Sequence, residues 1–240
     1  METIKTSIKS EAVFSDDKKH RVSLFREWNR NRPNALVIMI HPSISTEVQS
    51  DLTTVCILNN LSALEYGGVY INNLYSCVTD KIDYKFSPDE EILHKETDNY
   101  ILKAAEKASI IVLAWGSCGD NNRRIRKRQI ELMKKLMPYE HKVMAIQDNL
   151  GRRFLHPLTP QIRNSWNLVN VSIEKWLKDN PENKIAGIQD KSKKKANVKN
   201  TETTDKEETA VVTENAASVD SGNNEAEADT VNVEVEAIAS

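Results

Sequence analysis

The chain has 240 residues, with 33 Lys and Arg against 35 Asp and Glu, so its formal net charge is −2. Apolar runs such as Ile110–Trp115 contain six residues, far short of the ~20 that a helix needs to cross a bilayer, and Cys56, Cys77 and Cys118 lack the spacing of a metal site or a disulfide framework. With no apolar core in the first ten residues, these features exclude a membrane-spanning or disulfide-rich secreted protein and predict a cytoplasmic one.

The strands are predicted from apolar runs taken in chain order. Residues 11–28 indicate two short strands around a polar turn at Asp16–Lys19. Four longer runs, rich in branched residues, are typical of strands buried on both faces. They predict strands at Val37–Ile40, Val69–Ile71, Ile110–Ala114 and Val143–Ile146.

Helices are predicted between these strands from the period of the apolar residues. The first, at residues 51–66, begins with an acidic residue and ends at Gly67 and Gly68. The others are predicted at residues 90–108, at 122–137, where the helix is strongly basic, and at 165–178. Alternating strands and helices favour an α/β fold, a three-layer sandwich around a mainly parallel central sheet of about four strands.

The composition changes after this region. No aromatic residue follows Trp176, and from Lys191 onward the sequence is dominated by polar and charged residues. Such a segment cannot bury enough apolar surface to offset the conformational entropy lost on ordering. We therefore expect a flexible N-terminus at residues 1–10, one α/β domain at 11–180, and a disordered tail at 181–240 that is lysine-rich at first and then acidic.

The small net charge conceals an asymmetry between the domain and the tail. Residues 201–240 hold eleven acidic residues and one lysine, so residues 1–200 hold 32 basic and 24 acidic residues, balances of −10 and +8. A basic body favours an anionic partner such as DNA or a nucleotide, although a charge run is often only a solvated surface. Three roles are open for the tail: a solubilising extension, a contact to a protein partner, or competition with DNA for the basic surface. We expect a monomer.

Polar residues that follow the apolar strands are the candidate site, because ligands of parallel sheets bind at the carboxyl ends of the strands. One dipeptide, His-Pro, occurs twice in such positions, and alternation of strands and helices predicts that both copies reach the same edge of the sheet. The strand-end residues are His41, Pro42, Ser43, Asn72, Asn73, Trp115, Gly116, His156 and Pro157.

Eight separated pieces of sequence resemble one known family. In order, they are AVFS, Trp28, IMIHPS, Asp51 with Thr53, YGGVYINNLY, TD, AWG and HPL. This order resembles a bacterial and phage domain family of unknown function, numbered 1643, over residues 12–158. The usual first motif of that family is L-N-P-S-T-A-D, so His41 stands here in place of Asn, and SISTEV replaces the S-T-A-D run. The family does not imply a function.

A second, more distant resemblance implies a function. The pieces IHPS, VYINNLYSCVT, VLAWGS and LHPL follow the order of the motifs of uracil-DNA glycosylases. The resemblance implies a glycosylase-like fold, with His41 at the position that orients the water, Asn73 or its neighbour Asn72 reading the base edge, and His156 donating to a base carbonyl. We expect the base pocket to contain the strand-end residues Ser43, Trp115, Gly116, Pro42 and Pro157, with Asp51 as a further polar contact. Departure of a base needs charge stabilisation on the leaving group and a positioned water, and the base must be flipped into a pocket.

The basic residues suggest where a phosphate backbone binds. Arg152 and Arg153 lie beside His156 in a strand-end loop, which suits phosphate recognition. Arg123, Arg124 and Lys127 belong to the basic helix, although the arginines of that helix cannot all share one face.

Structural roles are the alternative for most of these residues. The two histidines are also explained as loop-capping residues next to prolines, Asn73 as a loop hydrogen-bonding residue, Trp115 as a core residue beside a turn glycine, and Asp51 as a helix cap.

The sequence leaves two classes of function open. One is an enzyme that hydrolyses the N-glycosidic bond of a modified or damaged base in DNA or a nucleotide. The other is a catalytically inactive nucleic-acid- or protein-binding accessory module on the same fold, of phage or plasmid type, which the replacement of Asn by His41 favours. Motifs of P-loop, dinucleotide-binding, metalloprotease and serine-hydrolase sites are absent, so we expect no metal and no cofactor.

Overall fold

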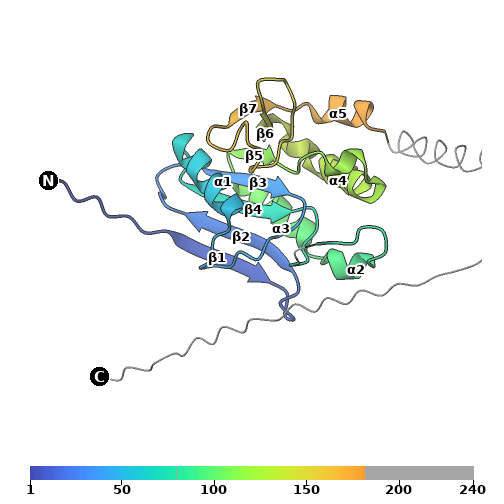
Figure 1. Cartoon of the computed structure of the whole chain (residues 1–240), viewed down its shortest axis with the longest axis horizontal. Helices are drawn as coiled ribbons and strands as arrows, with labels where there is room; N and C mark the ends of the chain where they lie inside the picture. Colours follow the sequence, from blue (N-terminus) through green and yellow to red (C-terminus); the bar gives the residue numbers. More distant parts are fainter. Residues whose placement is uncertain (80, 182–240) are drawn as a thin grey trace, which may run out of the picture. The chain divides into compact units, whose positions relative to one another are not determined.

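The computed structural model describes residues 1–79 and 81–181 (Figure 1). Seven strands of these residues form one sheet, in the spatial order β1-β2-β4-β3-β5-β6-β7. The predicted disordered tail lies outside the described residues, apart from residue 181.

The four long apolar runs form the centre of this sheet, as predicted. They are β3 (Asn34–Met39), β4 (Gly68–Asn73), β5 (Ile110–Leu113) and β6 (Val143–Gln147). All three pairings among them are parallel. Their side chains are buried on both faces, which explains why their sequences are apolar throughout rather than alternating.

The prediction of about four strands in the sheet is wrong, because antiparallel strands extend the parallel centre on both sides. The predicted hairpin of β1 (Lys9–Phe14) and β2 (Arg21–Glu27) adds to the free edge of β4. At the other edge, β7 (Asn167–Asn170) pairs with β6. These additions satisfy backbone groups that the two outer parallel strands would otherwise expose. The sheet also begins at Lys9, two residues before the expected start of the domain.

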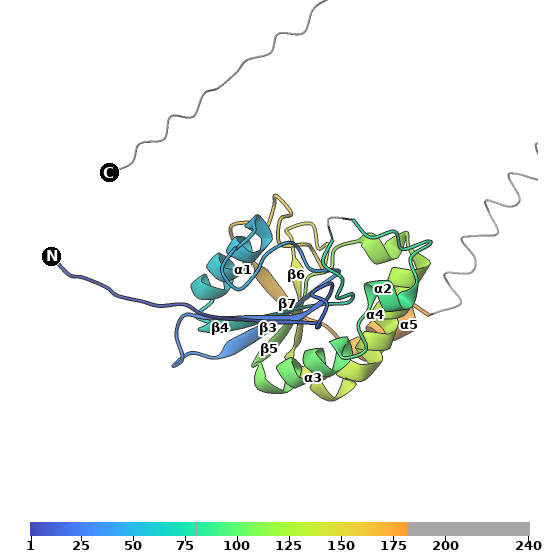
Figure 2. The same ribbon diagram turned by 90° about the horizontal axis from the view of Figure 1, so that it is seen from below.

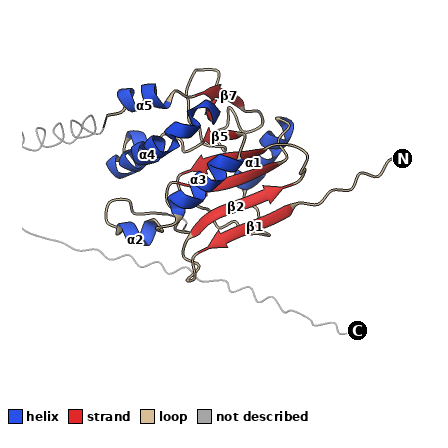
Figure 3. Ribbon diagram, turned by 180° about the vertical axis from the view of Figure 1, so that it is seen from behind, coloured by secondary structure: helices blue, strands red, loops and turns tan. Residues whose placement is uncertain are grey.

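Helices cover both faces of the sheet (Figure 2). On one face, α1 (Leu52–Ala63) packs Ile57 and Leu61 against β2, β3, β4 and β5. On the other face, α3 (Thr97–Lys107), α4 (Arg123–Leu136) and α5 (Ile173–Asp179) bury their apolar side chains in a second core cluster. Figure 3 shows the same layers from behind. None of the helices in the described part of the chain is long and apolar enough to cross a membrane.

Two predicted helices differ from the structure. The first half of the predicted helix at 165–178 is strand β7, in which Leu168 and Val169 pack against different core clusters, one on each face of the sheet. Ser172 then caps α5 through the Lys175 backbone N–H at 3.3 Å. This burial of apolar residues on two faces suits a strand better than a one-sided helix.

The predicted helix at 90–108 is interrupted. It consists of α2 (Asp89–Ile92) and α3, separated by residues 93–96, the first of which, Leu93, is extended. The carbonyl oxygen of Ile92 accepts hydrogen bonds from the backbone N–H groups of Ser76 and Cys77 at 3.0 and 3.3 Å. Because the loop after β4 occupies this carbonyl, the helix ends there.

Candidate functional site

The course of the chain leaves a crevice between β3 and β5. From β3 the chain crosses through α1 to β4, whereas from β5 it crosses through α4 to β6 on the opposite side. Loops that leave two neighbouring parallel strands in opposite directions create the position at which such sheets bind ligands. A cavity of about 830 Å³ opens there. The predicted site residues that line it are His41, Ser43, Asp51, Trp115, Gly116, Arg152, Arg153 and His156.

Four other predicted pocket residues do not line this cavity. Pro42 and Pro157 are buried in their loops. Asn72 is fully buried, and its Nδ2 donates to the Val22 carbonyl at 2.8 Å. Asn73 is 2% exposed, and its amide has no hydrogen-bond partner among the described residues. Alternation along β4 places Asn73 on the same face as Val69 and Ile71, under α1 rather than in the crevice.

Sequence reasoning missed other residues that line the cavity. Tyr84, Cys118, Asp120 and Thr159 come from loops that follow β4, β5 and β6. The Tyr84 hydroxyl is buried without a partner among the described residues, and this burial raises the pKa of Tyr84. The length of the loop from residue 74 to 88 was the one available signal, since long loops in compact domains are often functional.

The two histidines at the cavity are held in opposite tautomers by the backbone. The Nδ1 atom of His41 lies 3.1 Å from the Pro42 carbonyl oxygen, which can only accept, so Nδ1 carries the hydrogen. The Nδ1 atom of His156 accepts from the Leu158 backbone N–H at 3.2 Å. In the neutral imidazoles, Nε2 of His41 is therefore an acceptor and Nε2 of His156 is a donor.

The environment keeps His156 neutral. Burial lowers the pKa of His156 below its ordinary value of 6.5, and the nearby His41 lowers it further, although the charge of Asp51 acts in the opposite direction. Protonation would also place a hydrogen on Nδ1, where the Leu158 N–H already points. Both effects favour a neutral side chain that donates through Nε2.

Asp51 supplies a negative charge at the cavity. It is the N-cap of α1, as predicted, and its carboxylate accepts from the Thr54 backbone N–H at 2.7 Å. Burial alone would raise the pKa of Asp51, but hydrogen bonds from Ser43 and Thr54 and the charge of Arg21 outweigh it and leave the pKa below the usual range. The carboxylate is therefore ionised at neutral pH.

Arg21 holds the loop that follows His41. Its guanidinium, 2% exposed, donates to the carbonyl oxygens of Ser43 and Ser45 and, at 2.9 Å, to the Ser45 hydroxyl. Burial lowers the pKa of Arg21 to about 10, which leaves it charged at neutral pH. Arg21 could not be associated with the site from the sequence, because 22 residues separate it from Ser43.

Arg152 and Arg153, in the loop after β6, are each oriented by a hydrogen bond from Nε. The Nε of Arg152 donates to the buried Asp148 carboxylate at 2.6 Å, and the Nε of Arg153 donates to the Gln147 side chain at 2.9 Å. Their terminal amino groups make no hydrogen bond to other described residues. Since both side chains line the cavity, these amino groups are available to an anionic ligand.

The backbone that presents these residues is strained. Phe154, between Arg153 and Leu155, has a positive φ of 61°, which is uncommon for a bulky residue. Its carbonyl accepts from the Gly116 N–H at 2.7 Å, and its ring stacks on Trp115 with centroids 5.7 Å apart. Gly116 also has a positive φ of 68°, which a glycine adopts without steric cost. The loops after β5 and β6 are thus tied together beside His156.

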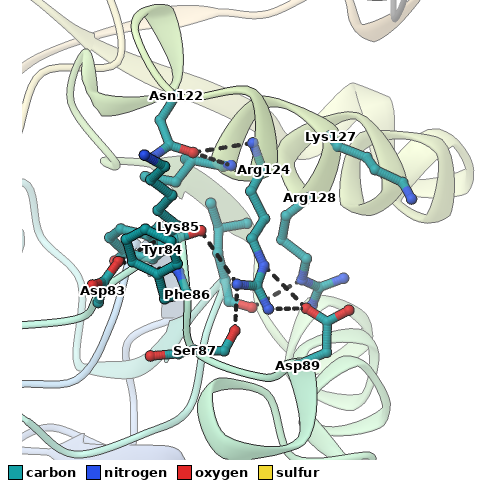
Figure 4. A network of polar contacts seen from close by, with 12 residues as sticks. Asp83, Tyr84, Lys85, Phe86, Ser87, Asp89, Asn122, Arg124, Lys127 and Arg128 are labelled. Carbon is teal, nitrogen blue, oxygen red and sulfur yellow. Dashed lines mark hydrogen bonds and ion pairs between the residues drawn. The ribbon is translucent and has the colours of Figure 1, made fainter.

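Side chains of the basic helix α4 form ion pairs and hydrogen bonds with other segments of the protein (Figure 4). Arg124 pairs with Asp89 and donates to the carbonyl oxygens of Tyr84 and Ser87, at 3.2 and 2.6 Å. Lys127 lies 3.9 Å from Glu131 on the surface, and Arg123 is exposed. Of the three helix residues predicted to bind nucleic acid, Arg124 thus already has protein partners.

One protein family matches the part of the chain that carries the cavity residues. The family model described as "Protein of unknown function (DUF1643)" matches residues 21–158, more than half of the chain. The chain belongs to this family. The matched segment runs from Arg21 through the second His-Pro and contains every cavity residue named above except Thr159. No curated protein and no solved structure matches the chain.

Proposed function

We propose that this protein hydrolyses the N-glycosidic bond of a modified or damaged base in DNA or a nucleotide. The observation that carries the proposal is the pair of histidines at one cavity, one held as an acceptor and the other as a donor. Hydrolysis of an N-glycosidic bond needs both functions, because a water loses a proton while the departing base gains negative charge.

The reaction follows from these two roles. A water donates a hydrogen bond to Nε2 of His41, and its oxygen attacks the anomeric carbon of the sugar. The bond between this carbon and the base nitrogen breaks, and its electron pair leaves with the base. His41 takes the proton of the water, while the Nε2–H of His156 donates a hydrogen bond to the carbonyl oxygen on which the charge of the base develops.

The remaining cavity residues complete the charge distribution. The ionised Asp51 stabilises the positive charge that develops on the sugar as the bond to the base breaks. Arg152 and Arg153 bind the phosphate next to that sugar. Trp115 forms an apolar wall, which lowers the local dielectric and strengthens these interactions.

The resemblance to uracil-DNA glycosylases supports the same chemistry from the sequence. His41 and His156, the two residues that it assigns to the water and to the base carbonyl, line one cavity. Asn73, the residue that it assigns to the base edge, does not. Base selection in this protein must therefore rest on other side chains of the cavity, such as Ser43, Ser117 and Tyr84.

The test is base release from oligonucleotides that carry uracil, oxidised pyrimidines or hypermodified pyrimidines, followed by alkali to cleave abasic sites. We expect His41→Ala to lower the rate by about 10²–10⁴-fold, as for a general base, and His156→Ala by about 10²–10³-fold, as for an oxyanion donor. His141→Ala is the matched control, since His141 is exposed and does not line the cavity. Tight binding of these oligonucleotides without release of any base would instead support an inactive binding module.

A further inference from the structure

Exposed apolar side chains lie on loops that also contribute residues to the cavity. The loops after β3, β4 and β6, together with the start of α1, carry Ile44, Val48, Leu52, Phe86 and Leu150, each at least 60% exposed. Exposing such groups is unfavourable, and clusters of them mark interaction sites. Two of these residues, Phe86 and Leu150, stand out because a hydrogen-bonded turn holds each of them in place.

Phe86 lies on a turn that the protein fixes from both ends. The Asp83 carboxylate accepts from the backbone N–H groups of Lys85 and Phe86 at 2.9 and 3.2 Å, and the Asp83 carbonyl accepts from Ser87 N–H at 3.0 Å. Arg124 reaches from α4 to the same turn, where it contacts two carbonyl oxygens (Figure 4). The ring is nevertheless 74% exposed. An exposed aromatic side chain on a hydrogen-bonded turn is prepared for a partner, because the backbone that carries it loses little conformational entropy on binding.

Leu150 is presented in the same way on the loop after β6. The Asp148 carboxylate accepts from the Leu150 N–H at 3.0 Å and from the Arg152 N–H at 2.9 Å, while Gly151 closes the turn at a φ of 78°. The leucine is 80% exposed. Each of these exposed residues is two residues away from one that lines the cavity. Tyr84 is that residue in the first turn, and Arg152 is that residue in the second.

We infer that the cavity takes a nucleotide within a single-stranded nucleic acid, with Phe86 and Leu150 binding the bases on either side; this inference rests on the proposed function. Stacking on an aromatic side chain suits an unpaired base, whose faces are free, and is independent of sequence. Lys85, whose Nζ lies 4.8 Å from the centre of the Phe86 ring, and Arg152 and Arg153 beside Leu150 supply cations for the phosphates. A free nucleotide bound in the cavity would contact neither Phe86 nor Leu150.

The electrostatics of the described residues also favour a single strand over a duplex. Duplex binding generally requires a broad basic face. The basic helix α4 does not provide one, because Arg124, Arg126 and Arg128 pair with Asp89, Asp120 and Asp98. A short strand that crosses the cavity needs only a few cations together with stacking.

The test is fluorescence anisotropy with a labelled single-stranded 12-mer at ~50 mM salt, compared with the duplex and with the free mononucleotide. We expect Phe86→Ala to weaken binding of the single strand about 10-fold, and Phe86→Tyr, which keeps the ring, to restore it. Leu150→Ser should also weaken it. Leu64→Ser is the matched control, because Leu64 is an exposed leucine at the far end of α1. None of these changes should alter binding of the mononucleotide.

Three results would overturn the inference: unchanged binding by Phe86→Ala and Leu150→Ser, tighter binding of the duplex than of the single strand, or equal affinity for mononucleotide and 12-mer. The proposed function is tested separately by base release. If Phe86→Ala and Leu150→Ser release a base at the wild-type rate, the inference is wrong and the proposed function stands. If the wild-type protein releases no base but these two variants bind the strand more weakly than it does, the inference stands and the proposed function is wrong.

Discussion

Two arginine-rich segments of this chain look alike in sequence and differ in the structure. In α4, the segment Arg123–Arg128 has three arginines that pair with aspartates of other elements or of the preceding turn. In the loop after β6, the side chains of Arg152 and Arg153 are held through Nε, and both residues line the cavity. The first segment pairs its charges within the fold, whereas the second leaves its terminal amino groups available to a ligand.

Local charge density in the sequence therefore does not identify a binding surface. Five basic residues among the six from Arg123 to Arg128 are the stronger nucleic-acid signal by count, but three of them pair with aspartates. A pair of arginines in a strand-end loop is the weaker signal by count, yet it lies at the ligand-binding edge of the sheet. The position of a cation relative to the sheet decides its role.

The largest effect is expected at Arg128, whose side chain is 5% exposed. It pairs with Asp98, and its Nε donates to the Leu74 carbonyl at 2.9 Å. Arg128→Met keeps the volume and leaves Asp98 with Lys135 alone. We expect a loss of about 3 kcal/mol in the free energy of unfolding, the lower end for breaking a buried pair, measured by urea denaturation. A loss below ~1 kcal/mol would contradict the stabilising role of α4, and Asp98→Asn in the same background would isolate the coupling between the two residues.

A smaller loss is expected at Arg124, whose partner Asp89 is largely exposed. Arg124→Ala removes two charged hydrogen bonds to the turn that carries Phe86. We expect about 2 kcal/mol of destabilisation and faster proteolysis of this turn than in the wild type. If the turn matters for strand binding, Arg124→Ala should weaken binding of the single-stranded 12-mer as much as Phe86→Ala does. Unchanged proteolysis would show that other contacts fix the turn.

The internal pairing of α4 could not be predicted from the sequence. Asp89 and Asp98 are 35 and 30 residues away from their arginine partners along the chain, and nothing local indicates the contact. Strand β7 could not be predicted either. Its residues have a helical apolar pattern, and it is the pairing with β6 that makes them a strand. By contrast, His41, Trp115 and His156 could be placed at one edge, because parallel strands bring their carboxyl ends together whatever the details. Asn73 failed this reasoning since its orientation depends on strand alternation, a shift of one residue reversing the face.

The loop arginines should affect ligand binding rather than stability. Arg152→Ala with Arg153→Ala removes two phosphate contacts, and the buried Asp148 keeps its bonds to backbone N–H groups. We expect the slope of log K against log salt for a single strand to become shallower by about 1.4, from ~0.7 per phosphate. Anisotropy titrations at several salt concentrations measure this slope. A double variant with the wild-type slope would contradict the assignment of these arginines to phosphate.

The pH dependence tests the donor role of His156 in the same region. Its folded pKa lies below the unfolded value of 6.5, so its contribution to stability is complete above pH 6.5 and is lost as the pH falls through the folded pKa. We expect the midpoint of the NMR titration of the His156 ring to lie below pH 6.5. Asp51→Asn keeps a capping side chain but removes a charge that raises the pKa of His156, so the midpoint should move to lower pH. A midpoint above pH 6.5 in the wild type would contradict a neutral His156.

The smallest effect is expected when two exposed cations of α4 are removed. Arg123→Ala with Lys127→Ala deletes the same charge as the loop double variant, and both residues are exposed. The pair between Lys127 and Glu131, four residues apart at 3.9 Å, contributes about 0.3–0.5 kcal/mol, so stability should change little. Because the total charge removed is equal in the two double variants, a general electrostatic attraction would lower strand affinity equally in both. We expect instead that the salt slope of this variant stays within error of the wild type, since our proposal assigns the phosphate contacts to Arg152 and Arg153. Equal slopes for the two double variants would show that α4 also binds the strand, and the division of roles between the two segments would then be wrong.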